Sequence, residues 1–187
     1  MFYTIIGGVN GVGKSSYTGS VKEKDTDFGV IVDVDKLTAK LHGNTLAGGK
    51  LAIRKIEECL ERGCSFTQET TLSGRRTEAT AKRAKALGYT VRLIYIALDT
   101  AEDSISRIGN RVSRGGHNIP SNDVTRRFAT RWSDVARILP YCDYAEFYDN
   151  TNGFQKVAEY RNGEIRTIGN AEPQWLLEML DYYRENT

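Results

Sequence analysis

The feature that most constrains this chain is the segment Gly-Val-Asn-Gly-Val-Gly-Lys-Ser at residues 8–15. It matches the pattern G-x-x-x-x-G-K-[S/T] at every fixed position, follows the apolar run 2–7 and precedes a predicted helix over 14–24. Glycines let the backbone turn tightly around an anion, and successive N–H groups at a helix N-terminus supply partial positive charge. We therefore expect a phosphate-binding loop here; a glycine-rich turn without a ligand is the alternative.

This motif assigns a role to each of its residues. Lys14 would reach the β- and γ-phosphates of a nucleoside triphosphate, and the hydroxyl of Ser15 would bind Mg²⁺. The expected cofactors are therefore ATP and Mg²⁺. The predicted nucleotide-binding residues are Gly8, Asn10, Gly11, Val12, Gly13, Lys14, Ser15 and Ser16.

A phosphate-binding loop leaves several functions open. A small-molecule kinase, a nucleotide-driven switch with little transfer activity and a motor ATPase all use one. A GTPase would need Asn-Lys-x-Asp, which the sequence lacks. The apolar run 89–98 ends in Asp99 as a Walker B strand would, but Thr100 follows and no sensor motif is visible downstream. The kinase interpretation is favoured by two further features, the acids and the arginines described next.

Strand and helix patterns alternate along the chain, which predicts right-handed βαβ units and an α/β fold. Strands are predicted at 2–7, 29–34, 65–70, 89–98 and 144–148. They predict a P-loop NTPase three-layer sandwich with a mostly parallel five-stranded sheet, as one domain over residues 1–187. A small C-terminal hairpin around Asn162-Gly163 and a closing helix are expected within about 154–184.

Acidic residues fall at the ends of the predicted strands. They are Asp33, Asp35, Glu69, Asp99 and Asp149. Ligands of open α/β sheets bind beyond these strand ends, and a kinase needs an acid that orients the acceptor hydroxyl and accepts its proton. We expect Asp35 to be this base, and Glu69 with Thr70 and Thr71 to hold the acceptor or a water on Mg²⁺. Helix capping is the competing interpretation of Asp35, whereas Asp33 and Asp99 are interpreted as structural.

The segment 107–131 contains six arginines and a single acid, Asp123. Two arginine-bearing helices joined by a Gly-Gly loop predict a lid that closes over the phosphates. The lid arginines proposed for catalysis are Arg111, Arg114 and Arg127, and His117 in the loop would contact substrate or hold the loop's shape. A solvated basic face, an RNA-binding patch and a nucleic-acid end kinase remain alternatives; nucleic acid is disfavoured because the segment is short and poor in aromatic residues.

Together these motifs resemble the zeta-toxin family of P-loop kinases, in particular its compact stand-alone members. The resemblance rests on residues 8–15, on Val-Asp-Val-Asp at 32–35, on Phe-Thr-Gln-Glu-Thr-Thr-Leu-Ser-Gly at 66–74, and on Arg-Val-Ser-Arg-Gly-Gly-His-Asn-Ile-Pro at 111–120 with Arg-Arg-Phe at 126–128. The family often has Asn-x-Asp where this chain has Asp33-Val34-Asp35. The resemblance implies ATP-dependent phosphorylation of a sugar hydroxyl, which for the toxins belongs to UDP-N-acetylglucosamine. Whether an antitoxin partner exists does not follow from this chain.

The remaining features predict a cytoplasmic protein. The N-terminus lacks a signal-peptide pattern, and no run of apolar residues approaches the length of a membrane span. The three cysteines, Cys59, Cys64 and Cys142, are expected to be reduced thiols. For the adenine contacts the sequence offers only the stretch 150–152, just past the last predicted parallel strand.

Overall fold

The computed structural model describes residues 1–21 and 28–186. The strands are β1 (Phe2–Gly7), β2 (Val30–Asp33), β3 (Phe66–Thr70), β4 (Thr90–Ala97), β5 (Tyr144–Asp149), β6 (Gln155–Arg161) and β7 (Glu164–Thr167). The helices are α1 (Lys14–Val21), α2 (Val34–Lys40), α3 (Thr45–Arg62), α4 (Arg76–Ala86), α5 (Ala101–Val112), α6 (Ser121–Ile138) and α7 (Gln174–Asn186). The helix expected at 14–24 is present as far as Val21, and its last three residues lie outside the described part.

One seven-stranded sheet runs in the order β2-β3-β1-β4-β5-β6-β7. β1 to β5 are parallel, whereas β6 and β7 pair antiparallel to their neighbours. The predicted five parallel strands are therefore confirmed. The C-terminal hairpin extends the same sheet, because β6 pairs along the edge of β5 and satisfies backbone groups that would otherwise be open.

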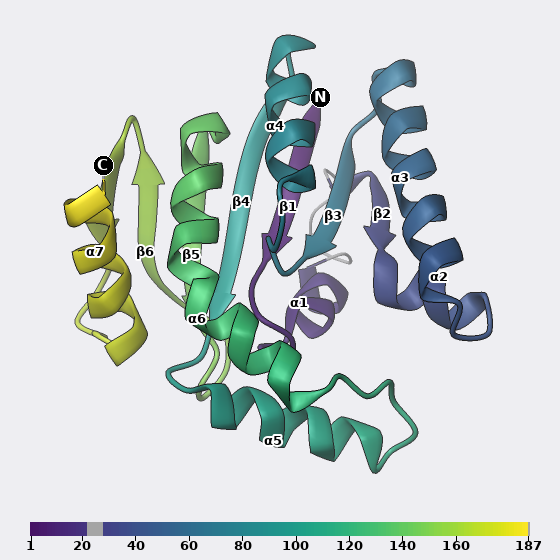
Figure 1. The fold of residues 1–187 in the computed structure, drawn as a ribbon. Helices are drawn as coiled ribbons and strands as arrows, with labels where there is room; N and C mark the ends of the chain where they lie inside the picture. Colours follow the sequence, from purple (N-terminus) through teal and green to yellow (C-terminus); the bar gives the residue numbers. More distant parts are fainter. Residues whose placement is uncertain (22–27, 187) are drawn as a thin grey trace.

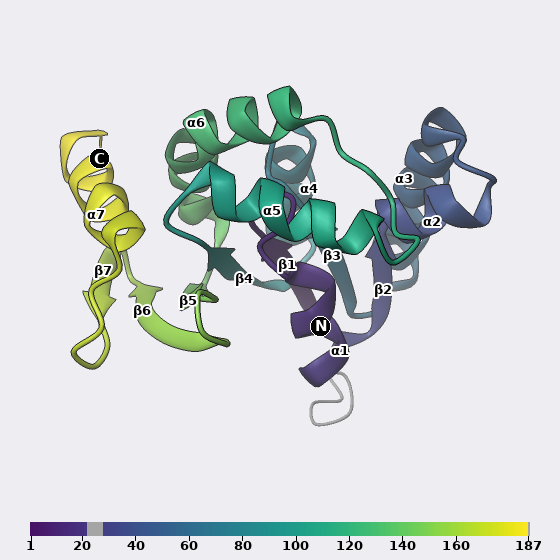
Figure 2. The same cartoon turned by 90° about the horizontal axis from the view of Figure 1, so that it is seen from below.

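Helices cover both faces of the sheet, which confirms the three-layer arrangement. Figures 1 and 2 show α3, α4, α6 and α7 on one face and α1 on the other. Side chains of each strand alternate between these faces. On β4, Leu93 and Tyr95 belong to the larger buried cluster, whereas Ile94 and Ile96 belong to the smaller one, which includes Tyr17 of α1.

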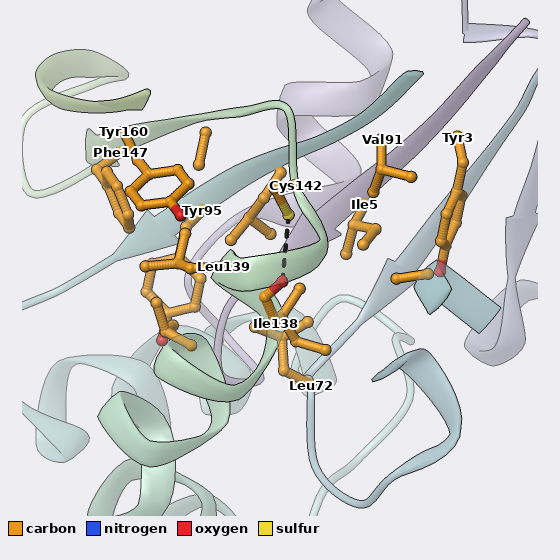
Figure 3. Close-up of a cluster of buried hydrophobic side chains, with 14 of the residues drawn as sticks. Tyr3, Ile5, Leu72, Val91, Tyr95, Ile138, Leu139, Cys142, Phe147 and Tyr160 are labelled. Carbon is orange, nitrogen blue, oxygen red and sulfur yellow. Dashed lines mark hydrogen bonds between the residues drawn. The ribbon is translucent and has the colours of Figure 1, made fainter. Parts of the chain in front are cut away.

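The larger cluster fixes α6 against the sheet. Figure 3 shows Ile138 and Leu139 at the end of α6 among Tyr95, Phe147 and Leu72, all fully or almost fully buried. The Cys142 thiol donates a hydrogen bond to the Ile138 carbonyl, with a donor–acceptor distance of 3.5 Å. None of the three cysteines forms a disulfide. Within the described residues, no helix is long and apolar enough to cross a membrane.

The topology brings distant segments to one edge of the sheet. Because β1 to β5 are parallel, their carboxyl ends meet there, and β1 lies between β3 and β4. Figure 1 shows α5 and the N-terminal half of α6 across this edge. The phosphate-binding motif, the predicted acids and the arginine segment therefore converge at one place.

Candidate active site

A cavity of about 740 Å³ opens at the carboxyl ends of the parallel strands. Most of the predicted site residues line it: Asn10, Gly11, Gly13, Lys14, Ser15, Ser16, Asp35, Glu69, Thr70, Thr71, Arg111, His117 and Arg127. Other lining residues that matter below are Asp33, Thr45, Gln68, Arg107, Asp123 and Asn150. Gly8 and Val12 shape the phosphate-binding loop from beneath, and Val12 is buried in the smaller apolar cluster.

Two glycines of the phosphate-binding loop are required by close approaches. A Cβ atom on Gly11 would lie 2.4 Å from the Ser104 carbonyl oxygen of α5, and one on Gly13 would lie 2.5 Å from the Asn150 amide nitrogen. Both glycines have φ values in the left-handed region, 90° and 102°. The Asn150 side chain donates to the Val12 carbonyl at 2.7 Å, so the end of β5 holds the loop in place.

Lys14 lies half-buried at the N-terminus of α1. Its ammonium donates to the carbonyls of Gly8 at 2.8 Å and Val9 at 3.0 Å. Burial lowers the pKa of Lys14 from its ordinary 10.5 to about 8, although Glu69 and other nearby carboxylates act in the opposite direction. The amine therefore titrates close to physiological pH.

The hydroxyl of Ser15 lies between two carboxylates. It donates to Glu69 at 2.7 Å, and Asp33 lies 3.4 Å away. Both acids are at most 7% exposed. The hydroxyl of Thr18 also donates to Glu69 at 2.7 Å, which fixes this carboxylate against α1. Oxygen donors of this kind suit Mg²⁺, which proteins commonly bind through one or two carboxylates together with substrate phosphates.

Asp33 and Asp35 both line the cavity, but only Asp33 caps a helix. Asp33, interpreted as structural, is the N-cap of α2 and accepts from the Lys36 backbone N–H at 3.1 Å, yet it also lines the cavity beside Ser15. Asp35 does not cap the helix; it lies in the first turn of α2 rather than at the strand end. Its exposed carboxylate lines the cavity and accepts no hydrogen bond from a residue in the described part of the chain.

The lid expected at 107–131 consists of α5, a loop and α6 lying over the phosphate-binding loop. Arg127 donates to the Asn10 side chain, and Arg111 donates to the His117 carbonyl at 2.7 Å. The His117 side of the loop lines the cavity, as Arg111 does. Pro120 is the N-cap of α6.

Arg114, predicted as a catalytic arginine of the lid, does not line the main cavity. It lies past the end of α5 and lines a neighbouring depression of about 490 Å³, which Arg107 and Arg111 also line. Arg107 lines the main cavity instead and donates to the Asn150 carbonyl at 2.7 Å and the Thr151 carbonyl at 3.2 Å. This contact ties α5 to the end of β5. The i, i+4 spacing of Arg107 and Arg111 was the sequence pattern from which a place for Arg107 in the cavity could have been predicted.

Only part of the stretch 150–152, which was the candidate for adenine contacts, lines the cavity. Asn150 lines the cavity with its side chain bound to the phosphate-binding loop, but Thr151 and Asn152 do not line it. Asp99 and Asp149, at the ends of β4 and β5, accept hydrogen bonds from the backbone and the indole N–H of Trp175. These two acids anchor α7, which confirms the structural interpretation of Asp99.

No role was predicted for two polar residues of the cavity, Gln68 and Thr45. Gln68 precedes Glu69 on β3 and accepts a hydrogen bond from the buried Tyr3 hydroxyl at 2.5 Å. Thr45 is the first residue of α3 and approaches the cavity only because α3 packs along α2. Both lie on the side of β2 and β3, where they accompany Asp35, Thr70 and Thr71.

Comparison with known proteins identifies the fold. No family's sequence profile matches the chain. A protein of Haemophilus influenzae described as uncharacterized is 29% identical over 126 residues, covering 65% of this chain and 88% of that protein. The structure from the PezAT chromosomal toxin–antitoxin system of Streptococcus pneumoniae matches with a TM-score of 0.64 at 17% identity, over 98% of this chain and 84% of that one.

The AvrRxo1-ORF1:-ORF2 complex is similar as well, with a TM-score of 0.69 at 15% identity over 98% of this chain and 75% of that one. A structure of the same complex with ATP has a TM-score of 0.68. The chain therefore shares the fold of these proteins. This fold is similar to that of zeta-toxin-like P-loop kinases, as the resemblance of the motifs implied.

Proposed function

We propose that this chain is a kinase that transfers the γ-phosphate of ATP, with Mg²⁺, to a hydroxyl group of a small molecule. The observation that carries the proposal is the arrangement around Ser15. Its hydroxyl touches two buried carboxylates in a cavity that Lys14, Arg127 and the exposed carboxylate of Asp35 also line. Phosphoryl transfer needs these three groups: cations for the phosphates, oxygen ligands for the metal, and a base at the acceptor.

The donor side suits a triphosphate. The N–H groups of residues 11–15 at the start of α1 and the ammonium of Lys14 would hold the β- and γ-phosphates. Arg111 and Arg127 lie across the cavity on the lid, where planar guanidinium groups would stabilise charge on the transferring group. Because α5 also packs against Gly11, the lid and the phosphate-binding loop form one surface.

The metal would sit beside Ser15, Asp33 and Glu69. When bound, Mg²⁺ neutralises developing charge on the phosphate oxygens. Within the described residues, no cluster of three or more His, Cys, Asp and Glu side chains could hold a metal by itself. Mg²⁺ is therefore expected to arrive with ATP, which supplies the remaining oxygen ligands.

Asp35 is proposed as the base. Its carboxylate faces the cavity from α2, opposite the phosphate-binding loop, and Lys14 is near enough to interact with it electrostatically. Glu69 is less suited to this task, because its two oxygens already accept from Ser15 and Thr18. Asp35 would orient the acceptor hydroxyl and accept its proton as the phosphate is transferred.

The acceptor proposed is a polyhydroxyl compound such as the sugar of UDP-N-acetylglucosamine. The β2–β3 side of the cavity carries the hydroxyls of Thr45, Thr70 and Thr71 and the amide of Gln68, beside carboxylates of which Asp33 forms an ion pair with Lys36 at 3.2 Å. Such groups exchange hydrogen bonds with sugar hydroxyls. A diphosphate attached to the sugar would have to lie toward Arg111 and His117 on the lid.

The proposed location is the cytoplasm, where ATP is abundant and the three free thiols stay reduced. The PezAT and AvrRxo1 structures come from systems with two components. A protein partner for this chain is therefore part of the proposal.

The experiment that tests this function incubates the whole chain with Mg²⁺ and ATP against nucleotide sugars, nucleosides and free sugars, and detects phosphorylated product by mass. Transfer to UDP-N-acetylglucosamine is the expected result, and Lys14→Met should abolish it. ATP bound tightly without product from any acceptor would overturn the kinase and favour the nucleotide-driven switch. Binding of oligonucleotides with a steep salt dependence would favour the nucleic-acid alternative.

A further inference from the structure

Arg137, in the last turn of α6, makes contacts that the proposed chemistry does not use. Its Nη2 atom donates to the carbonyl oxygens of Leu72 at 3.1 Å and Gly74 at 2.9 Å. These carbonyls belong to the β3–α4 loop (residues 71–75), which directly follows Glu69 and Thr70. One guanidinium therefore bridges two carbonyls of the loop that borders the acceptor side of the cavity.

Two acids hold this guanidinium in place. Asp134, one turn earlier on α6, accepts from Arg137 at 2.7 Å and is 5% exposed. Glu78 of α4 forms an ion pair with it at 3.3 Å. A second donor, the hydroxyl of Thr130, also reaches Asp134 at 3.1 Å. The guanidinium that meets the loop is thus hydrogen-bonded to an acid of its own helix and lies in an ion pair with an acid of α4.

The loop needs such support because its backbone is strained. Leu72 has a φ of 63°, a conformation that leucine rarely adopts. Its side chain is fully buried with Ile138 and Leu139, as Figure 3 shows, and its N–H donates to the Thr70 hydroxyl at 3.0 Å. Leu72 therefore links the buried core to Thr70, a residue that lines the cavity.

Helix α6 also contacts the donor side of the cavity. Arg127 of this helix donates to Asn10 of the phosphate-binding loop. Arg127 and Arg137 are ten residues apart, or roughly 15 Å along a helix. One rigid helix therefore touches both the loop that would hold the phosphates and the loop that borders the acceptor.

We infer that Arg137 is a positioning residue, which fixes the β3–α4 loop so that Thr70 and Thr71 meet the acceptor in the orientation required for transfer. The inference rests on the proposed kinase function. Loss of its two carbonyl bonds would let the strained Leu72 relax and move Thr70 and Thr71 relative to Glu69 and Asp35. Misplacement of about 1 Å at a reacting site costs on the order of 10²-fold in rate.

The test compares Arg137→Met, Arg137→Lys and the control Arg166→Gln, whose residue pairs with Glu164 on the exposed edge strand β7. Hydrogen–deuterium exchange is measured on peptides covering residues 70–76 and 8–16. Kinetics are measured with varied Mg·ATP and with UDP-N-acetylglucosamine, or whichever tested acceptor gives product.

Arg137→Met should raise exchange at 70–76 and leave 8–16 unchanged. It should lower kcat/KM for the acceptor by about ten- to a hundredfold while the KM for ATP stays within about twofold. Arg137→Lys, which keeps a donor, should recover part of the loss, and Arg166→Gln should match the wild type. Recovery by lysine is not expected if the arginine serves only to stabilise the fold.

Unchanged exchange at 70–76 in a folded Arg137→Met variant would overturn the inference, as would equal losses of ATP affinity and acceptor turnover. If Arg137→Met fails to fold, the same comparison is made with Arg137→Lys and with Glu78→Gln, which removes the ion pairs of Glu78 with Arg137 and Arg75 and leaves the carbonyl contacts of Arg137 in place. If the wild type transfers phosphate to no acceptor, the kinase function fails, whereas the exchange measurement still decides whether Arg137 holds the loop.

Discussion

The phosphate-binding loop and the β3–α4 loop face the same cavity but are built differently. The first is a contiguous motif whose shape comes from its own glycines, with Asn150 and Ser104 as neighbours. The second follows a strand, contains a strained leucine and takes its support from Arg137, 65 residues from Leu72. One short segment can thus specify an anion-binding loop, whereas the acceptor side depends on elements that come together only in the folded chain.

The two sides also differ in charge. The donor side carries Lys14, Arg107, Arg111 and Arg127, whereas the acceptor side carries Asp35 among hydroxyl and amide groups. Asp123 also lines the cavity near the arginines, and Lys36 forms an ion pair with Asp33 on the other side, so the division is one of excess charge. Under the proposed function, the polyphosphate would bind among the cations and the hydroxyl would approach a base. Variants on either side should therefore affect different steps, and the following predictions test that separation.

Lys14→Met should have the largest effect, because it acts on ATP binding and on transfer together. Losing a half-buried charged donor at a phosphate should weaken Mg·ATP binding by about 10²-fold or more. Isothermal titration calorimetry with Mg·ATP measures this, with the exposed Lys40 of α2 replaced by methionine as the control. Normal ATP affinity in Lys14→Met would contradict the assignment of the donor side.

Asp35→Asn should separate the two sides most clearly. Asparagine keeps the shape but cannot accept the proton, so transfer should fall by about 10²-fold or more, as is typical for a positioned base. The affinity for ATP should remain close to that of the wild type. Normal transfer by the variant, measured as phosphorylated product in single-turnover experiments, would remove Asp35 from the mechanism.

Asp33 serves two purposes that a pair of variants can separate. Serine is a good N-cap but no carboxylate, so Asp33→Ser should keep the stability of α2, whereas Asp33→Ala should lose about 1 kcal/mol in the free energy of unfolding. Both should need roughly tenfold more Mg²⁺ for half-maximal ATP binding, because one carboxylate beside Ser15 is gone. Urea unfolding and Mg²⁺ titrations distinguish these effects. An unchanged Mg²⁺ requirement in both would leave Asp33 with its capping role alone.

The smallest expected effect is the pH dependence of ATP affinity. Burial lowers the pKa of Lys14 to about 8, so the amine is protonated below this pH and loses its charge as the pH rises above it. Affinity for ATP should therefore fall above pH 8, by at most about tenfold per pH unit for one proton. Lys14→Arg keeps its charge over this range and should show a flatter profile. Identical profiles for the two proteins would assign the dependence to another group.

Much of the donor side could be predicted from local sequence. In the motif at 8–15, the glycines permit the backbone conformation of the loop and Lys14 supplies the charge, so a short segment is enough to recognise it. The βαβ pattern then places the motif after a central strand. The lid segment was also predictable, because glycines and helically spaced arginines signal their roles locally. The expectation for Arg114 assumed that the helix continues through this residue, but α5 ends at Val112, so helical spacing does not place Arg114 on the face of Arg107 and Arg111.

The amino-acid sequence by itself determined the α/β class, the phosphate-binding loop and the presence of carboxylates at strand ends, because these follow from periodicity and from short motifs. Only the tertiary structure decided which carboxylate meets which partner. It placed Asp33 and Glu69 on Ser15, left Asp35 open to the cavity, and assigned Asp99 and Asp149 to Trp175. The physical reason is that strand order and helix packing set these distances. The support of Leu72 by Arg137 likewise depends on how α6 crosses the sheet, which no local pattern encodes.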